Sequence, residues 1–204
     1  TSPRARAAAL AFTRAIDKLP LPTRSAPGFL VNRVLMPYMT EAMLAAAEGV
    51  PLAVIDDAAV RFGMPMGPIE LADIVGLDVC LHVGRILAQA FGRTAPEAVV
   101  PLVEAGKLGK KTGQGLYEWR DGKAVKPPVP EGYEAPADLA DRLLLALVNE
   151  SMAVLREGVV ADADLIDAGV IFGSGFAPFR GGPLRYAQER GVAQVVATLE
   201  TLAA

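Results

Sequence analysis

The spacing of apolar residues along the chain predicts helices. Residues 3–18 and 29–48 each carry an apolar stripe at the period of an α-helix. Pro37 lies inside the second segment, so we expect a kink or a break near residues 33–36. Shorter helices are expected at residues 51–63, at 68–91 with an interruption near Gly76, and at 96–106.

Three other segments lack the helical period. Residues 19–24 are short and contain proline, which suits an edge strand or an extended exit. Residues 106–119 contain glycines too densely spaced for a stable helix, and residues 116–119 suit a short extended piece. Prolines are frequent in residues 120–136, so we expect a linker there.

The pattern of the first long helix returns after this linker. Residues 138–157 are predicted to be helical, and Glu41 and Glu150 are 109 positions apart, as are Gly49 and Gly158. The Gly-Pro pairs at 67–68 and 182–183 are 115 positions apart, so the second copy contains small insertions. The sequence therefore contains a duplicated helical unit, and such units often bury their apolar faces against a copy.

We therefore predict an all-α fold with four parts. A helix–strand segment covers residues 1–26, a first helical unit 27–119, a linker 120–136 and a second helical unit 137–204. The opening helix and strand have no partner strands after them, so they resemble the end of a sheet domain that is otherwise missing.

Composition excludes several classes of protein. The 204 residues are 52% apolar with a net charge of −3, and both signs are scattered along the chain. No basic stripe indicates nucleic-acid binding, and no uncharged apolar run is long enough to span a membrane. The single cysteine, Cys80, excludes an internal disulfide and a zinc site built on thiolates, and it fits a cytoplasmic location.

Asn32 is the first candidate for a functional side chain. An amide one turn into an apolar helix can hold a ligand carbonyl or hydroxyl, but it can equally satisfy a helix end or a loop, and the residues alone favour the structural role. Glu41 is nine positions further on, which is half a turn out of phase. We therefore expect Asn32 and Glu41 to face different sides.

The usual catalytic groups are scarce. His82 is the only histidine, and no carboxylate lies three or four positions after it, so it is interpreted as a surface or core residue. Lys110 and Lys111 lie in a glycine-rich loop that lacks the spacing of a phosphate-binding P-loop, and a solvated turn is favoured over a phosphate contact. Phe172 ends a helix before a glycine, which by itself indicates core packing.

Three motifs in order resemble the C-terminal domain of 3-hydroxyacyl-CoA dehydrogenases: residues 27–50, 62–78 and 109–117. Residues 138–187 resemble the second copy of that domain in the multifunctional α-subunit of the fatty-acid β-oxidation complex. Residues 1–26 resemble the closing helix and strand of the family's Rossmann domain. The resemblance implies two copies packed as a pseudo-dimer, because the helical domain is the dimer interface of single-copy members.

The resemblance also implies a function. The family oxidises (3S)-hydroxyacyl-CoA to 3-ketoacyl-CoA with NAD, using a His–Glu pair of the Rossmann domain. No residue of this chain matches that pair and no G-x-G-x-x-G unit is present, so we expect the chain alone to be inactive and to bind no NAD. Asn32 matches the asparagine of the family's Val-Asn-Arg motif, which contacts the acyl-CoA. Phe172 matches a substrate-contacting aromatic residue that is often tyrosine.

The expected partners are the acyl-CoA substrate, the protein's own Rossmann domain and a thiolase subunit. Two alternatives stay open. One is a stand-alone helical module that binds acyl-CoA or assembles with a partner without oxidoreductase activity. The other is the dimerisation domain of another Rossmann enzyme, such as a 6-phosphogluconate-type dehydrogenase. The leading helix–strand segment argues against the first, and the tandem motifs argue against the second.

Overall fold

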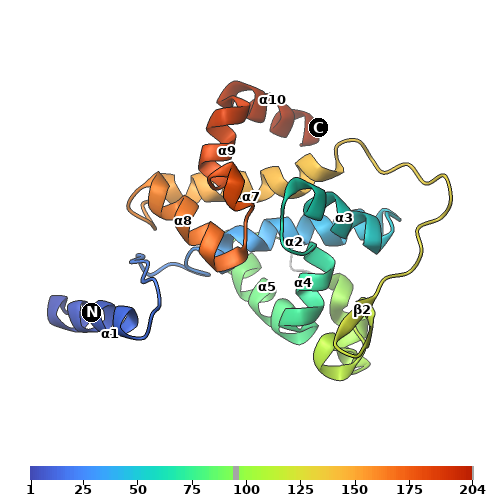
Figure 1. Cartoon of the computed structure of the whole chain (residues 1–204), viewed down its shortest axis with the longest axis horizontal. Helices are drawn as coiled ribbons and strands as arrows, with labels where there is room; N and C mark the ends of the chain where they lie inside the picture. Colours follow the sequence, from blue (N-terminus) through green and yellow to red (C-terminus); the bar gives the residue numbers. More distant parts are fainter. Residues whose placement is uncertain (94–96, 204) are drawn as a thin grey trace.

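The computed structural model describes residues 1–93 and 97–203 and shows a mainly helical molecule (Figure 1). The helices are, in chain order, α1 (Pro3–Ala15), α2 (Val31–Ala47), α3 (Leu52–Phe62), α4 (Pro68–Val75), α5 (Leu77–Phe91), α6 (Val100–Glu104), α7 (Leu139–Arg156), α8 (Ala163–Ser174), α9 (Pro183–Arg190) and α10 (Val192–Leu202). Within the described ranges, the one sheet is an antiparallel hairpin of β1 (Glu118–Arg120) and β2 (Lys123–Val125).

The core lies between α2 and α7, which run side by side through the middle of the molecule (Figure 1). Both helices are lined on the shared side by fully or almost fully buried residues: Val34, Tyr38, Ala42 and Ala45 from α2, and Leu143, Leu147 and Val154 from α7. Their spacings of three, four and seven positions place them on one side of each helix. Burial of each larger aliphatic side chain contributes roughly 1.5–3 kcal/mol to folding.

Most of the predicted helices are confirmed, with shorter ends. α2 continues through Pro37 as one helix, so the break that was considered near residues 33–36 does not occur. The predicted interruption at Gly76 separates α4 from α5, because this residue has a φ of 102°. Of the predicted helix 96–106, residues 100–104 form α6, whereas Pro96 lies outside the described residues.

Of the two alternatives for residues 19–24, the edge strand is wrong and the extended exit remains. This segment has no strand assignment, and its main anchor is a hydrogen bond from the Arg24 amide to the Val159 carbonyl at 2.8 Å. A strand requires a neighbour for its backbone groups, and the chain between 1 and 93 offers none. α1 precedes this segment, has no buried residue and stands apart from the other helices in Figure 1.

The predicted linker is ordered at its start. Residues 118–125 form the β1–β2 hairpin, and Lys126 returns to the first unit to contact Asp56 at 3.1 Å. The chain then runs without regular structure until α7 and passes around one side of the molecule (Figure 1). The irregular segment therefore begins after Val125 rather than at residue 120, because three-residue strands have no detectable apolar period in the sequence.

The duplication seen in the sequence extends to side-chain contacts. In the first unit, the Asp56 carboxylate on α3 accepts a hydrogen bond of 2.9 Å from the Ile69 amide at the start of α4. In the second unit, Asp167 on α8 accepts one of 2.7 Å from the Leu184 amide at the start of α9. Each unit therefore uses a buried aspartate to fix the beginning of its third helix.

A buried ion-pair network joins the two units. The Arg33 guanidinium on α2 contacts Glu150 at 2.7 Å and Glu157 at 2.6 Å, both in the second unit. The side chains of Arg33 and Glu150 are each only 3% exposed. These bonds raise the pKa of Arg33, with the Glu157 hydrogen bond as the largest cause.

The second unit makes the reverse contacts. Arg142, which is 109 positions after Arg33, contacts Glu48 at 2.6 Å and Glu41 at 3.5 Å in the first unit. The glutamates in the two networks also correspond at an offset of 109. The arginine of each segment thus reaches glutamates of the other.

We expect Arg33→Ala to destabilise the chain more than Arg142→Ala. Removing Arg33 leaves the buried Glu150 carboxylate with only Arg93 as a partner, which should cost about 3 kcal/mol. The Arg142 side chain is 18% exposed and its partner Glu48 is 53% exposed, so water can replace that contact. The free energies of unfolding in urea measure both losses, and equal losses would contradict the assigned difference in burial.

Candidate functional site

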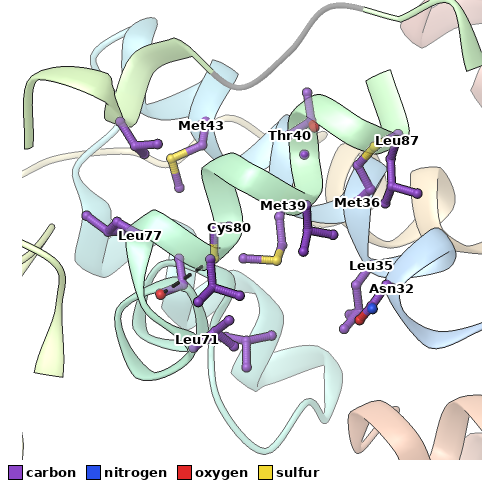
Figure 2. Close-up of a pocket in the computed structure, with 16 residues that line it drawn as sticks. Asn32, Leu35, Met36, Met39, Thr40, Met43, Leu71, Leu77, Cys80 and Leu87 are labelled. Atoms are coloured by element: carbon purple, nitrogen blue, oxygen red, sulfur yellow. Dashed lines mark hydrogen bonds between the residues drawn. The ribbon is translucent and has the colours of Figure 1, made fainter. Parts of the chain in front are cut away.

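Asn32 lies at the entrance of an apolar cavity. It occupies the first turn of α2, its side chain is exposed, and it makes no hydrogen bond to the described residues. The cavity has a volume of about 170 Å³ and lies between α2, α4 and α5 (Figure 2). An amide with free donor and acceptor capacity is therefore available at the edge of an apolar space.

The cavity is lined almost entirely by apolar side chains. α2 contributes a row of methionines at positions 36, 39 and 43, which lie around the cavity in Figure 2. α2 also contributes Leu35 and Thr40, and Val99 lies just before α6. α4 and α5 contribute Leu71, Ala72, Val75, Leu77, Val79, Cys80, Val83 and Leu87. Methionine is flexible and polarisable, so such a lining can adapt to apolar ligands of different shape.

Cys80 behaves as part of this apolar lining. Its thiol donates a weak hydrogen bond to the Ala72 carbonyl at 3.7 Å. Burial is the main cause that raises the pKa of Cys80 to about 11. The thiol is therefore neutral near pH 7, which agrees with the interpretation of Cys80 as a packing residue rather than a nucleophile.

Asn32 and Glu41 face different sides of α2, as their spacing predicts. Asn32 lies at the cavity between α2 and α5, whereas Glu41 points toward α7 and contacts Arg142 at 3.5 Å. Pro37 lies between them without bringing the two side chains together. Glu41 therefore contributes to the contact between the units and not to the Asn32 site.

Phe172 is exposed and does not line the same cavity as Asn32. Its side chain is 74% exposed at the end of α8, where it borders a separate groove between α8 and α9. The end of α8 nevertheless lies close to the start of α2, because a side chain added at Gly173 would collide with Val31. Phe172 thus lies on α8, whose end is next to the start of α2. The interpretation of this residue as core packing is wrong.

His82 lies on the outer face of α5 and is exposed. It does not line the cavity, although Leu81 and Val83 on either side of it are buried or half-buried. Its position agrees with the surface interpretation. Within the described residues, the cavity edge therefore presents an amide but no histidine.

The glycine-rich loop is organised by a buried carboxylate that sequence analysis did not single out. Asp73 accepts hydrogen bonds from the Leu116 and Tyr117 amides, both at 2.8 Å, and from the Trp119 indole at 2.9 Å. Gly115 packs directly against Asp73, where a larger residue would collide. The sequence signal was an aspartate between the apolar residues Ala72 and Ile74 of α4.

The two lysines of this loop lie outside the cavity. Lys111 pairs with Asp78 at 2.5 Å, and the Lys110 ammonium lies 5.4 Å from the centre of the Trp119 ring. Both side chains belong to exposed residues. These contacts support a solvated turn and leave the phosphate contact without structural support.

Comparison with known proteins identifies a related family. The family described as "3-hydroxyacyl-CoA dehydrogenase, C-terminal domain" matches residues 28–119. The "Fatty acid oxidation complex subunit alpha" of Acinetobacter baumannii (strain AYE) is 37% identical over 223 residues, which cover all of this chain and 31% of that protein. The protein of the same name from Idiomarina loihiensis is also 37% identical and is covered to 30%.

Solved structures show the same fold. A 3-hydroxybutyryl-CoA dehydrogenase from Escherichia coli matches with a TM-score of 0.79 over 99% of this chain and 61% of that chain, at 24% identity. The (S)-3-hydroxybutyryl-CoA dehydrogenase PaaH1 from Ralstonia eutropha is 36% identical with a TM-score of 0.54, covering 59% of this chain and 44% of that one.

This chain spans about a third of the length of the curated relatives that it matches. The matches agree with the helical architecture and with the motifs around Asn32, the FGMPMGP segment and the glycine-rich loop. Residues 28–119 therefore match the C-terminal domain of 3-hydroxyacyl-CoA dehydrogenases, and the chain as a whole is similar to about a third of the fatty acid oxidation α-subunits.

Proposed function

We propose that this chain is the helical, substrate-holding part of an NAD-dependent 3-hydroxyacyl-CoA dehydrogenase of fatty-acid β-oxidation. The whole reaction would convert a (3S)-hydroxyacyl-CoA to the 3-ketoacyl-CoA. The observation that carries the proposal is the Asn32 amide at the entrance of the apolar cavity between α2, α4 and α5. The similarity of the whole of this chain to 31% of a fatty acid oxidation α-subunit supports the proposal.

In this proposal the two ends of the site bind different parts of an acyl thioester. The Asn32 amide can donate to a carbonyl oxygen and accept from a hydroxyl near the reacting carbon. The cavity behind it takes apolar atoms of the acyl tail. Each methylene that leaves water there stabilises the bound state by roughly 0.8 kcal/mol, so the cavity would favour substrates with more than a minimal chain.

Proton abstraction is assigned to residues outside this chain. His82 is exposed on the outer face of α5 and does not line the cavity edge. We therefore place the His–Glu pair and the NAD site in a nucleotide-binding domain that contacts the Asn32 face. The described residues do not themselves fit a dinucleotide, because their sheet is one antiparallel hairpin rather than a parallel sheet with glycine-rich turns.

We also propose that the two helical units take the places of two subunits. The crossed networks of Arg33 and Arg142 support this arrangement, because each unit uses corresponding residues to bind the other. The apolar face of α2 is then covered by α7 of the same chain. A pairing within one chain would remove the need for a second chain at this surface.

The role of Phe172, the partner protein, the location and the activity of the chain alone stay predictions. Phe172 is exposed near the first turn of α2, which is compatible with a substrate contact, but it lies on a different groove. The thiolase partner and the inactivity of the chain alone are expected from the resemblance, and the cytoplasmic location is expected from the single cysteine. No helix within residues 1–93 and 97–203 is both long and apolar enough to cross a bilayer.

A module that binds acyl-CoA without oxidoreductase activity is the alternative. The cavity and Asn32 would serve such a module equally well. The dehydrogenase assignment is favoured because relatives match this chain from end to end as part of a much longer α-subunit. A reading frame encoding a G-x-G-x-x-G unit directly before residue 1 would support the dehydrogenase, whereas a natural start codon there would support the module.

In a protein that carries the complete dehydrogenase, Asn32→Ala should lower kcat/KM for 3-hydroxybutyryl-CoA at least about tenfold, because a hydrogen bond to the reacting end is lost. Lys110→Ala is the control, since Lys110 is exposed and lies over the Trp119 ring. It should change kcat/KM less than about twofold. Initial-rate measurement of NADH formation compares them, and equally small effects would remove Asn32 from the site.

Val83→Phe should shorten the range of accepted substrates. Val83 is half-buried and lines the cavity, so a larger ring there excludes part of a long acyl tail. Loss of two buried methylenes corresponds to about a tenfold lower kcat/KM for a long-chain substrate, with little change for 3-hydroxybutyryl-CoA.

The matched control is His82→Phe, which adds the same ring to the outer face of α5. This control should leave the ratio of long-chain to short-chain kcat/KM unchanged. If Val83→Phe and His82→Phe gave the same ratio, the acyl tail would not lie in this cavity.

A further inference from the structure

The duplication allows the apolar cavity whose entrance Asn32 occupies (the Asn32 cavity) to be compared with its counterpart in the second unit. An offset of 109 relates α2 to α7, and at an offset of 115 the bounds of α4 fall on those of α9. The same offset relates the glycines before α5 and α10, since Gly76 and Gly191 have similar φ values of 102° and 95°. The space between α7, α9 and α10 is therefore the counterpart of the cavity between α2, α4 and α5.

Positions that are half-buried in the first unit are buried in the second. Met36 and Met39 line the Asn32 cavity and are both half-buried. Their counterparts on α7 are Leu145 and Val148, which are only 0% and 3% exposed. Both belong to a buried apolar cluster that α7 forms with α9 and α10. An apolar space that is open in the first unit is thus packed in the second.

Two larger side chains account for this difference. Tyr186 stands at the position of Leu71, and Leu199 stands at the position of Gly84. Leu71 and Gly84 line the Asn32 cavity, whereas Tyr186 and Leu199 pack against the apolar cluster of α7, α9 and α10. Each side chain is larger than the one that it replaces, so the pair occupies volume that the first unit leaves free.

An ion pair stands where the first unit has its entrance. Asp141 takes the position of Asn32, and Arg190 takes the position of Val75. The Arg190 guanidinium donates hydrogen bonds of 2.7 Å to the Asp141 carboxylate and of 3.1 Å to the Tyr186 hydroxyl. The Arg190 and Asp141 side chains are only 18% and 33% exposed. The polar group at the position of Asn32 is therefore bound within its own unit.

An open groove that borders this region does not replace the cavity. It lies between α7 and α10, and Leu199 is part of its lining. Arg142 and Glu150, which both take part in ion pairs with the first unit, also line it. An acyl tail in this groove would remove charged groups from water, which is unfavourable.

We propose that the second unit contains a closed copy of the Asn32 cavity, and that the chain therefore takes one acyl ligand rather than two. Two positions decide whether a unit accepts a ligand. Leu71 and Val75 leave the space of the first unit open. Tyr186 and Arg190 close the corresponding space of the second unit. The ligand part of this inference rests on the function proposed for the Asn32 cavity, whereas the closed copy itself does not.

Xenon under pressure locates apolar cavities in crystals of this chain, because empty apolar cavities in proteins take up xenon. One xenon site is expected between α2, α4 and α5, and none between α7, α9 and α10. The double variant Tyr186→Leu with Leu199→Ala should gain a xenon site between α7, α9 and α10. Tyr186→Phe keeps the ring and is the matched control, so it should gain no site.

The closing residues can also be transferred to the first unit. Asn32→Asp, Leu71→Tyr and Val75→Arg together copy the corresponding side chains of the second unit. This triple variant should lose the xenon site and bind octanoyl-CoA at least about tenfold more weakly than the unchanged chain in isothermal titration calorimetry. Ile74→Arg is the control, since Ile74 is 41% exposed on α4 and does not line the cavity, and it should bind octanoyl-CoA as the unchanged chain does.

Several results would overturn the proposal. They are xenon between α7, α9 and α10 in the unchanged chain, two octanoyl-CoA molecules per chain, no xenon in the Asn32 cavity, or a folded double variant that gains no site. If the double variant does not fold, the triple variant decides, and a retained xenon site there would overturn the proposal. A chain that takes up xenon as expected but binds no octanoyl-CoA would contradict the proposed function and leave the closed copy supported.

Discussion

The contact between α2 and α7 is the constraint on which the rest of the molecule depends. Their apolar faces form the middle of the core, and the buried pair of Arg33 and Glu150 fixes how the helices sit against each other. A buried arginine that loses its partner is strongly unfavourable, so alternative registers of the two helices are penalised. With one side of α2 fixed in this way, the opposite side presents Asn32 and the methionine row to the cavity.

Buried aspartates provide the second level of organisation. Asp56 and Asp167 hold the starts of α4 and α9, and Asp73 holds the glycine-rich loop. These carboxylates explain why glycine is required nearby, since Gly67 and Gly182 pack directly against Asp56 and Asp167. The family-like sequence of this loop is therefore accounted for by a structural contact rather than by phosphate binding. The α4 helix, which this loop covers, also lines the Asn32 cavity.

Periodicity and the internal offsets predicted the helices and the duplication, because both are recorded in single residues along the chain. The edge-strand alternative for residues 19–24 was wrong because a strand depends on a partner that local sequence does not reveal. The crossed contacts of Arg33 and Arg142 were also missed, although both positions are visible at the offset of 109. Their pairing depends on how two helices from distant segments cross. For Asn32, the residues alone favoured a structural role, whereas the family resemblance and the cavity behind the side chain favour ligand binding.

In the proposed arrangement, the two helical units cover each other within one chain, which would leave the face carrying Asn32 free for substrate and for a further domain. Light scattering of the purified chain, coupled to size exclusion and extended to high concentration, tests this most directly. A pairing of α2 with α7 within one chain predicts a monomer with a mass near 21.4 kDa at all concentrations. A tight dimer that persists on dilution, and that dissociates when Arg33 is replaced, would show that α2 pairs between chains and would contradict it.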